Sequence, residues 1–156
     1  MVDQDSVWMQ AALAEAEAAF TDGEVPVGAV IVADNVVIGR GRNATVRTQD
    51  PTAHAEIQAI RQAAEHIGSW RLEGCALYAT LEPCAMCAGA LVLSRIQRLV
   101  YGADDPKAGA CGSVRNIVQD PRLNHRIDVA RGVLRKPCGD LLRSFFRGLR
   151  AKDSRQ

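Results

Sequence analysis

The sequence has few aromatic residues, no long hydrophobic run and almost no net charge. Aromatic side chains make up 4% of its 156 residues, and 19 lysines and arginines nearly balance 18 aspartates and glutamates. The apolar stretch from Val25 to Ala33 is far shorter than the roughly 18 residues that a membrane-spanning helix needs. With 47% hydrophobic residues, the composition fits one soluble globular domain over residues 1–156 and disfavours disorder.

Cysteine is also scarce. The five cysteines are too few, and odd in number, for a disulfide scaffold. The segment from Met1 to Ser6 is polar and acidic and does not resemble a secretion signal. We therefore expect a cytoplasmic protein whose clustered cysteines bind a metal ion or take part in chemistry.

The formal net charge of +1 hides an uneven distribution along the chain. Residues 1–121 carry 9 basic and 15 acidic side chains, net −6, whereas residues 122–156 carry 10 basic and 3 acidic ones, net +7. A basic segment of this kind attracts polyanions such as nucleic acids. The average charge argues against a nucleic-acid partner, but the C-terminal segment favours one.

Hydrophobic periodicity and turn residues predict alternating helices and strands. We expect helices over residues 6–20, 53–67, 84–94, 113–118 and 138–150. We expect strands over residues 25–33, 36–42, 75–81, 96–101 and 126–130, with the first two joined as a hairpin at Asp34-Asn35. The stretch 103–113, which contains Gly, Asp and Pro, is the expected functional loop. This order indicates one α/β domain.

Two short segments contain side chains of the kinds that bind metal ions. His54 and Glu56 lie at the start of one expected helix, and Cys84 and Cys87 lie at the start of another, after Pro83. Cysteines in one helical turn project to the same side, so both sulfurs reach one ion at about 2.3 Å. With one imidazole they make three ligands and leave the fourth tetrahedral position open, which is typical of catalytic zinc.

Glu56 is placed to serve acid–base chemistry at such a site. Zinc lowers the pKa of its water to about 7, and a nearby carboxylate can carry a proton from that water to a substrate nitrogen. We interpret Glu56 as this proton carrier and not as a ligand. Taken separately, a C-x-x-C pair is also a redox motif, and a lone histidine on a helix is usually a surface or core residue. The combination favours zinc.

These segments resemble the zinc-dependent cytidine deaminase superfamily, whose H-x-E and P-C-x-x-C signature they contain. The chain resembles the bacterial tRNA adenosine deaminases in particular, along nearly its whole length. The resemblance is carried by residues 24–30, 50–57, 80–90, 124–126 and 145–147. It implies a three-layer α/β/α fold around a mixed five-stranded sheet, with one zinc ion per chain. It also implies a homodimer that hydrolytically converts the wobble adenosine of a tRNA anticodon to inosine.

The resemblance implies roles for individual residues. His54, Cys84 and Cys87 match the zinc ligands, and Glu56 matches the proton carrier. Asn43 matches an asparagine that hydrogen-bonds the flipped base, although an asparagine after a strand is otherwise an ordinary turn residue. The other expected substrate-binding residues are Ala55 and Ala85 through their backbones, and Val27, Leu81, Asp105, Lys107, His125, Arg126, Phe145, Phe146 and Arg147.

Several of these residues also have a purely structural interpretation. Val27 and Leu81 fit core packing equally well. Asp105 and Lys107 suit a surface turn, and residues 125–126 suit a cationic turn that flanks a helix. Their function depends on where the fold places them.

The expected C-terminal helix combines arginines with two aromatic residues. Arg143, Arg147 and Arg150 share one side of it, and Phe145 and Phe146 interrupt them. Arginines can clamp phosphates while one ring packs on a base and the other anchors the helix. The alternative is a solvated cationic face with two core phenylalanines. The basic excess of the C-terminal segment favours RNA, and the family resemblance implies that this RNA is the tRNA anticodon stem-loop.

Two other functions remain open from the sequence. A deaminase of free guanine or cytosine, or of their nucleotides, contains the same catalytic segments but has no need of a basic Phe-Phe-Arg helix. A zinc-stabilised RNA-binding module would need a fourth cysteine or histidine beside the other ligands. We expect Cys75, Cys111 and Cys138 to be packing residues or unreactive thiols instead.

Overall fold

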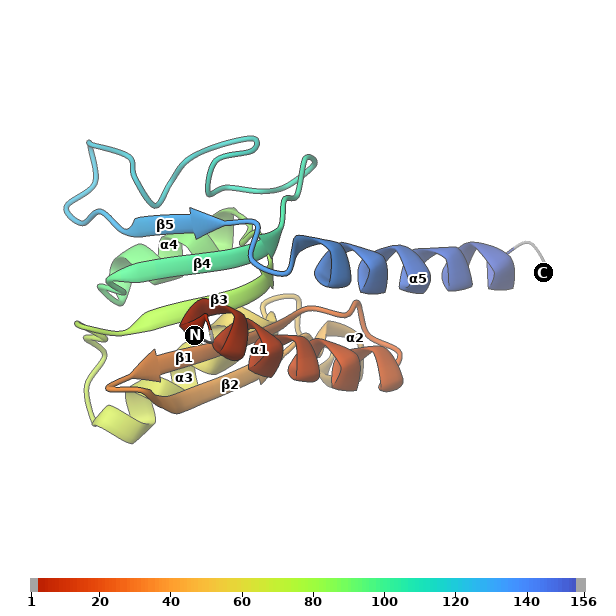
Figure 1. Cartoon of the computed structure of the whole chain (residues 1–156), viewed down its shortest axis with the longest axis horizontal. Coiled ribbons are helices and arrows are strands. Elements are labelled where there is room, and N and C mark those ends of the chain that lie inside the picture. Colours follow the sequence, from red (N-terminus) through yellow and green to blue (C-terminus); the bar gives the residue numbers. More distant parts are fainter. Residues whose placement is uncertain (1–2, 154–156) are drawn as a thin grey trace.

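A mixed five-stranded sheet forms the centre of the computed structural model, which describes residues 3–153 (Figure 1). Its strand order is β2-β1-β3-β4-β5. The strands are Gly28–Ala33 (β1), Val36–Arg42 (β2), Ala76–Leu81 (β3), Arg98–Ala103 (β4) and Asp128–Arg131 (β5). β1 pairs antiparallel with β2 and β3, whereas β3, β4 and β5 are parallel.

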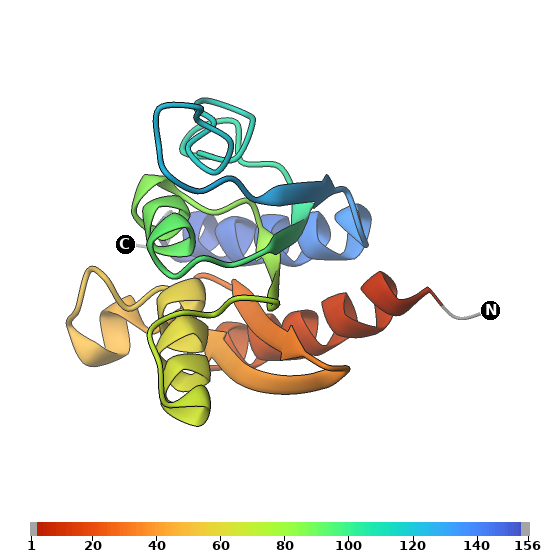
Figure 2. The ribbon, with the colours of Figure 1, turned by 90° about the vertical axis from the view of Figure 1, so that its left-hand side faces the viewer.

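Helices cover both faces of the sheet. They are Gln4–Thr21 (α1), Thr45–Thr48 (α2), Ala55–Ile67 (α3), Ala85–Leu93 (α4) and Arg135–Asp153 (α5). α1 and α5 lie on one face, with α3 and α4 on the other (Figure 1 and Figure 2). The expected three-layer α/β/α fold is therefore confirmed. None of the helices formed by residues 3–153 has both the length and the apolar character needed to cross a membrane.

The central strands are buried on both faces, which explains their continuous apolar sequences. Val30 and Val100 pack with Met9 of α1 in one hydrophobic cluster. Ile31 and Leu99, one position away along the same strands, pack in the other cluster with residues of α3 and α4. Successive side chains of a strand point to opposite faces, so each central strand joins the two cores.

The polarity of the strands brings several chain segments to one edge of the sheet. Because β1 is antiparallel to both neighbours, its first residue, Gly28, pairs with Arg42 at the end of β2. The ends of β3 and β4 lie at the same edge, where Leu81 pairs with Ala103. The segments that precede β1 and follow β2, β3 and β4 therefore meet there.

Most predicted elements are confirmed within a few residues. The hairpin turn at Asp34 and Asn35 has φ values of 51° and 61°, as a two-residue type I′ turn requires. The first strand starts at Gly28, later than predicted, because Val27 donates to the carbonyl oxygen of Val25 in a tight turn. α5 begins earlier than predicted, at Arg135, since its first turn tolerates Pro137.

The prediction of a helix over residues 113–118 is wrong. Cys111 and Asn116 form an isolated β-bridge, and the N–H of Ser113 donates to the carboxylate of Glu82 instead of to a helical carbonyl group. Conversely, the sequence does not predict α2, whose two N–H groups at Val46 and Arg47 are bound by a distant side chain, Glu24. Both differences arise from buried carboxylates remote in sequence.

The close approach of α3 to β2 generates a stability prediction. A Cβ atom at Gly41 would lie 2.0 Å from the carbonyl oxygen of Ala55, which is backbone and moves only with the helix. We expect Gly41→Ala to lower the free energy of unfolding by about 3 kcal/mol, measured by chemical denaturation.

Gly148→Ala in α5 is the matched control, because a Cβ there would meet nothing within 4 Å. We expect it to raise the free energy of unfolding by about 0.5–1 kcal/mol, since alanine favours helix over glycine. Equal stability of Gly41→Ala and the wild type would contradict the packing described for α3.

Candidate active site

His54, Cys84 and Cys87 meet at this edge of the sheet. His54 is the N-cap residue of α3, Cys84 is the N-cap residue of α4, and Cys87 lies in the first turn of α4. The Nδ1 atom of His54 lies 3.6 Å from Sγ of Cys84 and 3.5 Å from Sγ of Cys87. All three candidate ligand atoms lie within 4.8 Å of one another. The structure thus brings together the three residues predicted as metal ligands.

These distances fit a tetrahedral zinc ion. Zn–N near 2.1 Å and Zn–S near 2.3 Å, with a tetrahedral angle between them, separate nitrogen from sulfur by about 3.6 Å. Two thiolates and one imidazole are also a donor set that zinc accepts. Among residues 3–153, the cluster contains only these three candidate ligands. It could therefore hold a metal ion and leave a fourth position for water or substrate.

The surroundings of the cluster favour a thiolate. Hydrogen bonds from Cys87 and His54 lower the pKa of Cys84 to about 3, although burial acts in the opposite direction. The hydrogen bond to Cys84 raises the pKa of His54. The pKa of Cys87 is raised because its thiol donates to Cys84 and is buried. A thiolate is the form of cysteine that binds metals, so the lowered pKa of Cys84 favours metal binding by its sulfur.

Glu56 is a buried carboxyl group beside the cluster. It lies in the first turn of α3 and is 4% exposed. Burial raises its pKa, since removal from water disfavours the charged form. It lines a cavity of about 300 Å³ together with His54 and Cys84. A carboxylate whose pKa is raised binds a proton more readily and can pass it on to a base, which is what a proton carrier must do.

The cavity also contains an unpaired polar atom. Asn43, directly after β2, is 7% exposed and lines the cavity. Within the described part of the chain, its Oδ1 atom has no hydrogen-bond partner. A buried oxygen without a partner costs free energy, which a ligand that donates a hydrogen bond would recover. Asn43 is therefore placed to bind a molecule in the cavity.

Segments from five places in the sequence form the cavity walls, including the one that contains Asn43. Val27 precedes β1, Leu81 ends β3, and Asp105 belongs to the loop after β4. Ala55, the first residue of α3, also lines the cavity. Ala85, the first residue of α4, is exposed and is not part of this lining. Five of the residues predicted to bind substrate thus surround one cavity: Val27, Asn43, Ala55, Leu81 and Asp105.

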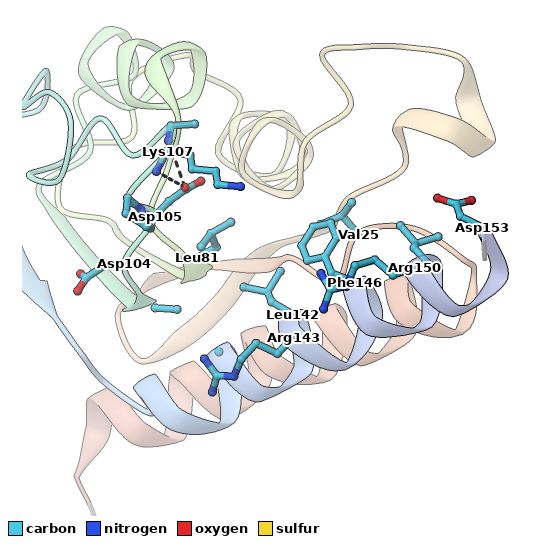
Figure 3. A pocket seen from close by; sticks show the side chains of 15 residues that line it. Val25, Leu81, Asp104, Asp105, Lys107, Leu142, Arg143, Phe146, Arg150 and Asp153 are labelled. Carbon is cyan, nitrogen blue, oxygen red and sulfur yellow. Dashed lines mark hydrogen bonds between the residues drawn. The ribbon is translucent and has the colours of Figure 1, made fainter.

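A larger groove of about 850 Å³ adjoins the cavity and follows α5 (Figure 3). Cavity and groove share four residues: Val25, Leu81, Asp105 and Ala108. The loop after β4 adds Lys107, and α5 adds Arg143, Phe146 and Arg150 (Figure 3). The groove therefore has an apolar floor at Leu81, and its lining carries three basic side chains together with the acidic Asp104, Asp105 and Asp153.

The two phenylalanines of α5 have different surroundings. Phe145 packs edge-on against Phe20 of α1, with ring centroids 5.9 Å apart. Phe146 is 40% exposed and lines the groove. One ring anchors the helix while the other faces the groove. Arg147 is exposed but does not line the groove. Arg143 and Arg150 line it.

His125 and Arg126 lie near the opposite edge of the sheet. Nε2 of His125 is 2.7 Å from the carbonyl oxygen of Ile96, which lies shortly before the start of β4. The cavity lies at the other edge, where β3 and β4 end. Neither residue lines the cavity or the groove. Their contact with RNA stays a prediction.

Two buried carboxylates that the sequence analysis did not single out hold the cavity walls. Glu24 and Glu82 are each 2% exposed. Glu24 accepts hydrogen bonds from the first N–H groups of α2, while Glu82 binds the loop after β4. Burial would raise the pKa of Glu82, but hydrogen bonds from Ser113 and from the backbone outweigh it and lower that pKa. The available signal was that Glu24 directly precedes one apolar segment and Glu82 directly follows another, where a buried carboxylate needs partners.

Comparisons with known proteins agree with this geometry. A family model described as MafB19-like deaminase matches residues 3–150. The tRNA-specific adenosine deaminase of Bacillus subtilis (strain 168) is 49% identical over 149 residues, which cover 96% of this chain and 92% of that protein. The tRNA-specific adenosine deaminase of Haemophilus influenzae is 49% identical over 143 residues, which cover 91% and 83%.

Two solved structures have a similar fold. A tRNA:A34 deaminase, studied for A-to-I editing at the wobble position of transfer RNA, superposes with a TM-score of 0.84 at 47% identity. The match covers 86% of this chain and 98% of that one. A guanine deaminase from Nitrosomonas europaea superposes with a TM-score of 0.74 at 27% identity, and the match covers 90% of this chain and 83% of that one. Its family match and these identities place the chain among the MafB19-like deaminases, in the family of the tRNA-specific adenosine deaminases.

Proposed function

We propose that this protein hydrolytically deaminates adenosine to inosine at the wobble position of a tRNA anticodon. The observation that carries the proposal is that a cavity and a groove lie side by side at one edge of the sheet. The cavity beside Glu56 adjoins the cluster of His54, Cys84 and Cys87, and it borders a groove along α5 whose lining includes Lys107, Arg143 and Arg150. A deaminase of free bases would use the cavity alone. The relatives named tRNA-specific adenosine deaminases, at 44–49% identity, support the tRNA substrate.

We further propose that the cluster holds one zinc ion per chain, through Nδ1 of His54 and Sγ of Cys84 and Cys87. When bound, zinc supplies the Lewis acidity that makes a water molecule nucleophilic near neutral pH. The positive ends of α3 and α4 lie at the cluster, because two of these residues cap the helices. These helix ends favour the thiolate form of the cysteines.

The residues of the chain orient the base and move the protons. Oδ1 of Asn43 accepts a hydrogen bond from the base, while Val27 and Leu81 form apolar walls that exclude bulk water. Glu56 accepts a proton from the water that adds to C6 of adenine and passes it to the base. The remaining proton of the added hydroxyl then moves to the amino group, the C6–N bond breaks, ammonia leaves, and the hydroxyl oxygen stays as the carbonyl of inosine. An anticodon loop presents this base already unpaired, which avoids the cost of opening a duplex.

The groove provides the contacts that a tRNA loop needs beyond its reactive base. Lys107, Arg143 and Arg150 line it from two sides, where they can contact phosphates. Phe146 offers an exposed ring for stacking on a neighbouring base, and Phe145 holds the helix in place. We therefore assign α5 as the main RNA-contacting element. The Ala85 backbone, Asp105 and Arg147 stay predicted contacts.

We also propose that residues 1–156 act as one deaminase domain in a homodimer. α4 contains no charged residue, and it exposes Met86 by 36% and Leu93 by 70%. An apolar helix face of this kind is typical of a surface covered by a partner, and the family resemblance indicates a second copy. The molar mass of the protein in solution decides between monomer and dimer. The cytoplasmic location expected from the sequence stays a prediction.

Substitution of Glu56 tests the reaction itself. Glu56→Gln keeps the shape of the side chain but removes the proton carrier, so we expect turnover to fall by about 10²- to 10⁴-fold with zinc still bound. The measurement is inosine formation in an anticodon stem-loop, detected by mass spectrometry. Glu65→Gln, an exposed residue of the same helix, is the control and should leave the rate unchanged. Turnover of Glu56→Gln at the wild-type rate would remove Glu56 from the mechanism.

Alkylation of the cysteines tests the metal site. After zinc is removed with a chelator, iodoacetamide at about pH 6 should modify Cys84 first, because only a thiol with a lowered pKa is a thiolate there. Burial raises the pKa of Cys111, and raises that of Cys138 to about 11, so both should react slowly. Added zinc should protect Cys84. Equal modification of all three cysteines, measured by peptide mass spectrometry, would contradict the described site.

Removal of a groove arginine tests the RNA interface. Arg150→Ala should weaken binding of the anticodon stem-loop by about 3- to 10-fold and lower the slope of log affinity against log salt by about 1. Arg71→Ala is the matched control, because Arg71 is an exposed arginine paired with Glu73 outside the groove. If both variants show the same salt dependence as the wild type, α5 does not contact phosphates through Arg150.

A further inference from the structure

Glu82 makes an unusually complete set of hydrogen bonds between two parts of the active site. One carboxylate oxygen accepts from the N–H of Asp105 at 3.0 Å and from the hydroxyl of Ser113. The other accepts from the N–H of Cys111 at 3.1 Å and from the N–H of Ser113 at 3.0 Å. Both oxygens are thus used by residues 105–113, a loop at least 23 residues further along the chain.

This carboxylate links the loop to the metal-binding segment. Glu82 is two residues before Cys84, and its own N–H donates to the carbonyl oxygen of Ala103 at 2.9 Å. The carbonyl oxygen of Pro83, between Glu82 and Cys84, accepts from the N–H of Ala110 at 2.9 Å. The segment that carries the candidate ligand and the loop are therefore joined by consecutive hydrogen bonds.

The loop forms a wall shared by the cavity and the groove. Asp105 and Ala108 line both, and Lys107 lines the groove (Figure 3). Asp105 receives the N–H groups of Lys107 and Ala108 at 3.0 and 3.1 Å, so its position fixes the turn that follows. Through the Asp105 N–H, Glu82 sets the distance between this wall and the metal-binding segment.

Gly109 shows how closely the loop is fitted to the carboxylate. A Cβ atom at this position would lie 2.3 Å from Cδ of Glu82 and 2.4 to 2.5 Å from its two oxygens. Any larger residue would have to displace either the loop or the buried carboxylate. The glycine therefore allows the loop to wrap around Glu82.

We propose that Glu82 is a positioning residue that holds the loop of residues 105–113 against the metal-binding segment and so shapes the substrate-binding wall. The inference rests on the proposed function for its kinetic consequence. The structural consequence of the inference is independent of the proposed function, because the order of the loop can be measured without substrate.

Glu82→Gln is the direct test. An amide offers one acceptor oxygen where the carboxylate offers two, so part of the set of four donors loses its acceptor. We expect amide hydrogen exchange within residues 105–113 to accelerate by about tenfold or more. For an anticodon stem-loop, we expect KM to rise by about fivefold or more and kcat to fall, with zinc content unchanged. A smaller population of folded enzyme would lower kcat without changing KM.

Asp5→Asn is the matched control for general destabilisation. Asp5 is also a hydrogen-bonded carboxylate, paired with Arg98 at 2.7 Å and with Tyr78 at 2.8 Å, but it joins α1 to the sheet away from the cavity. This variant should leave KM and the loop exchange at wild-type values. Wild-type KM and wild-type loop exchange in Glu82→Gln would overturn the proposal, and so would a loss of activity that follows loss of zinc.

Gly109→Ala gives a second route in case Glu82→Gln does not fold. It keeps the carboxylate but displaces the loop, so it should raise KM in the same way. Combined with Glu82→Gln, its effect should be less than additive, because both changes release one loop. Fully additive effects would overturn the proposal. If the wild type leaves the stem-loop adenosine unchanged, the proposed function fails, while the exchange measurement still decides the role of Glu82.

Discussion

The active site depends on the pairing of β3 between an antiparallel and a parallel neighbour. Since β1 runs against β3 while β4 runs with it, the start of β1 and the ends of β2, β3 and β4 share one edge. The crossover helix α4 must begin at that edge, because a parallel connection returns over the face of the sheet. Its first turn therefore presents two cysteines next to the cap of α3. The close approach of α3 to β2 at Gly41 keeps His54 within reach of both sulfurs.

The sequence predicts those parts of the site that depend on local spacing. Two cysteines in one helical turn and a glutamate two residues after a histidine are local patterns, and the fold brings their ligand atoms together as expected. The β2 strand and the hairpin turn were likewise predictable, because alternation and turn residues act over a few positions. Local patterns could not reveal α2 or the irregular path after Gly109, since distant carboxylates determine both.

Helical periodicity also could not separate the roles of the two adjacent phenylalanines. Only the position of α1 shows that Phe145 contacts Phe20 while Phe146 faces the groove. In the same way, the spacing of the arginines placed three of them on one side of a helix. Which of these arginines line the groove depends on the side of α5 that meets the loop after β4. Arg143 and Arg150 line it, and Arg147 does not (Figure 3).

The C-terminal helix extends beyond the sheet, and this affects the thermodynamics of recognition (Figure 1). From Phe146 to Asp153 every residue is exposed, so the last two turns of α5 receive little support from the core. An unsupported helical turn is marginal in water, because few residues compensate for the conformational entropy that it loses. In the proposed complex with RNA, the free energy of binding therefore includes the free energy of stiffening these turns. Affinity at this groove should consequently depend on temperature more steeply than its charges alone would suggest.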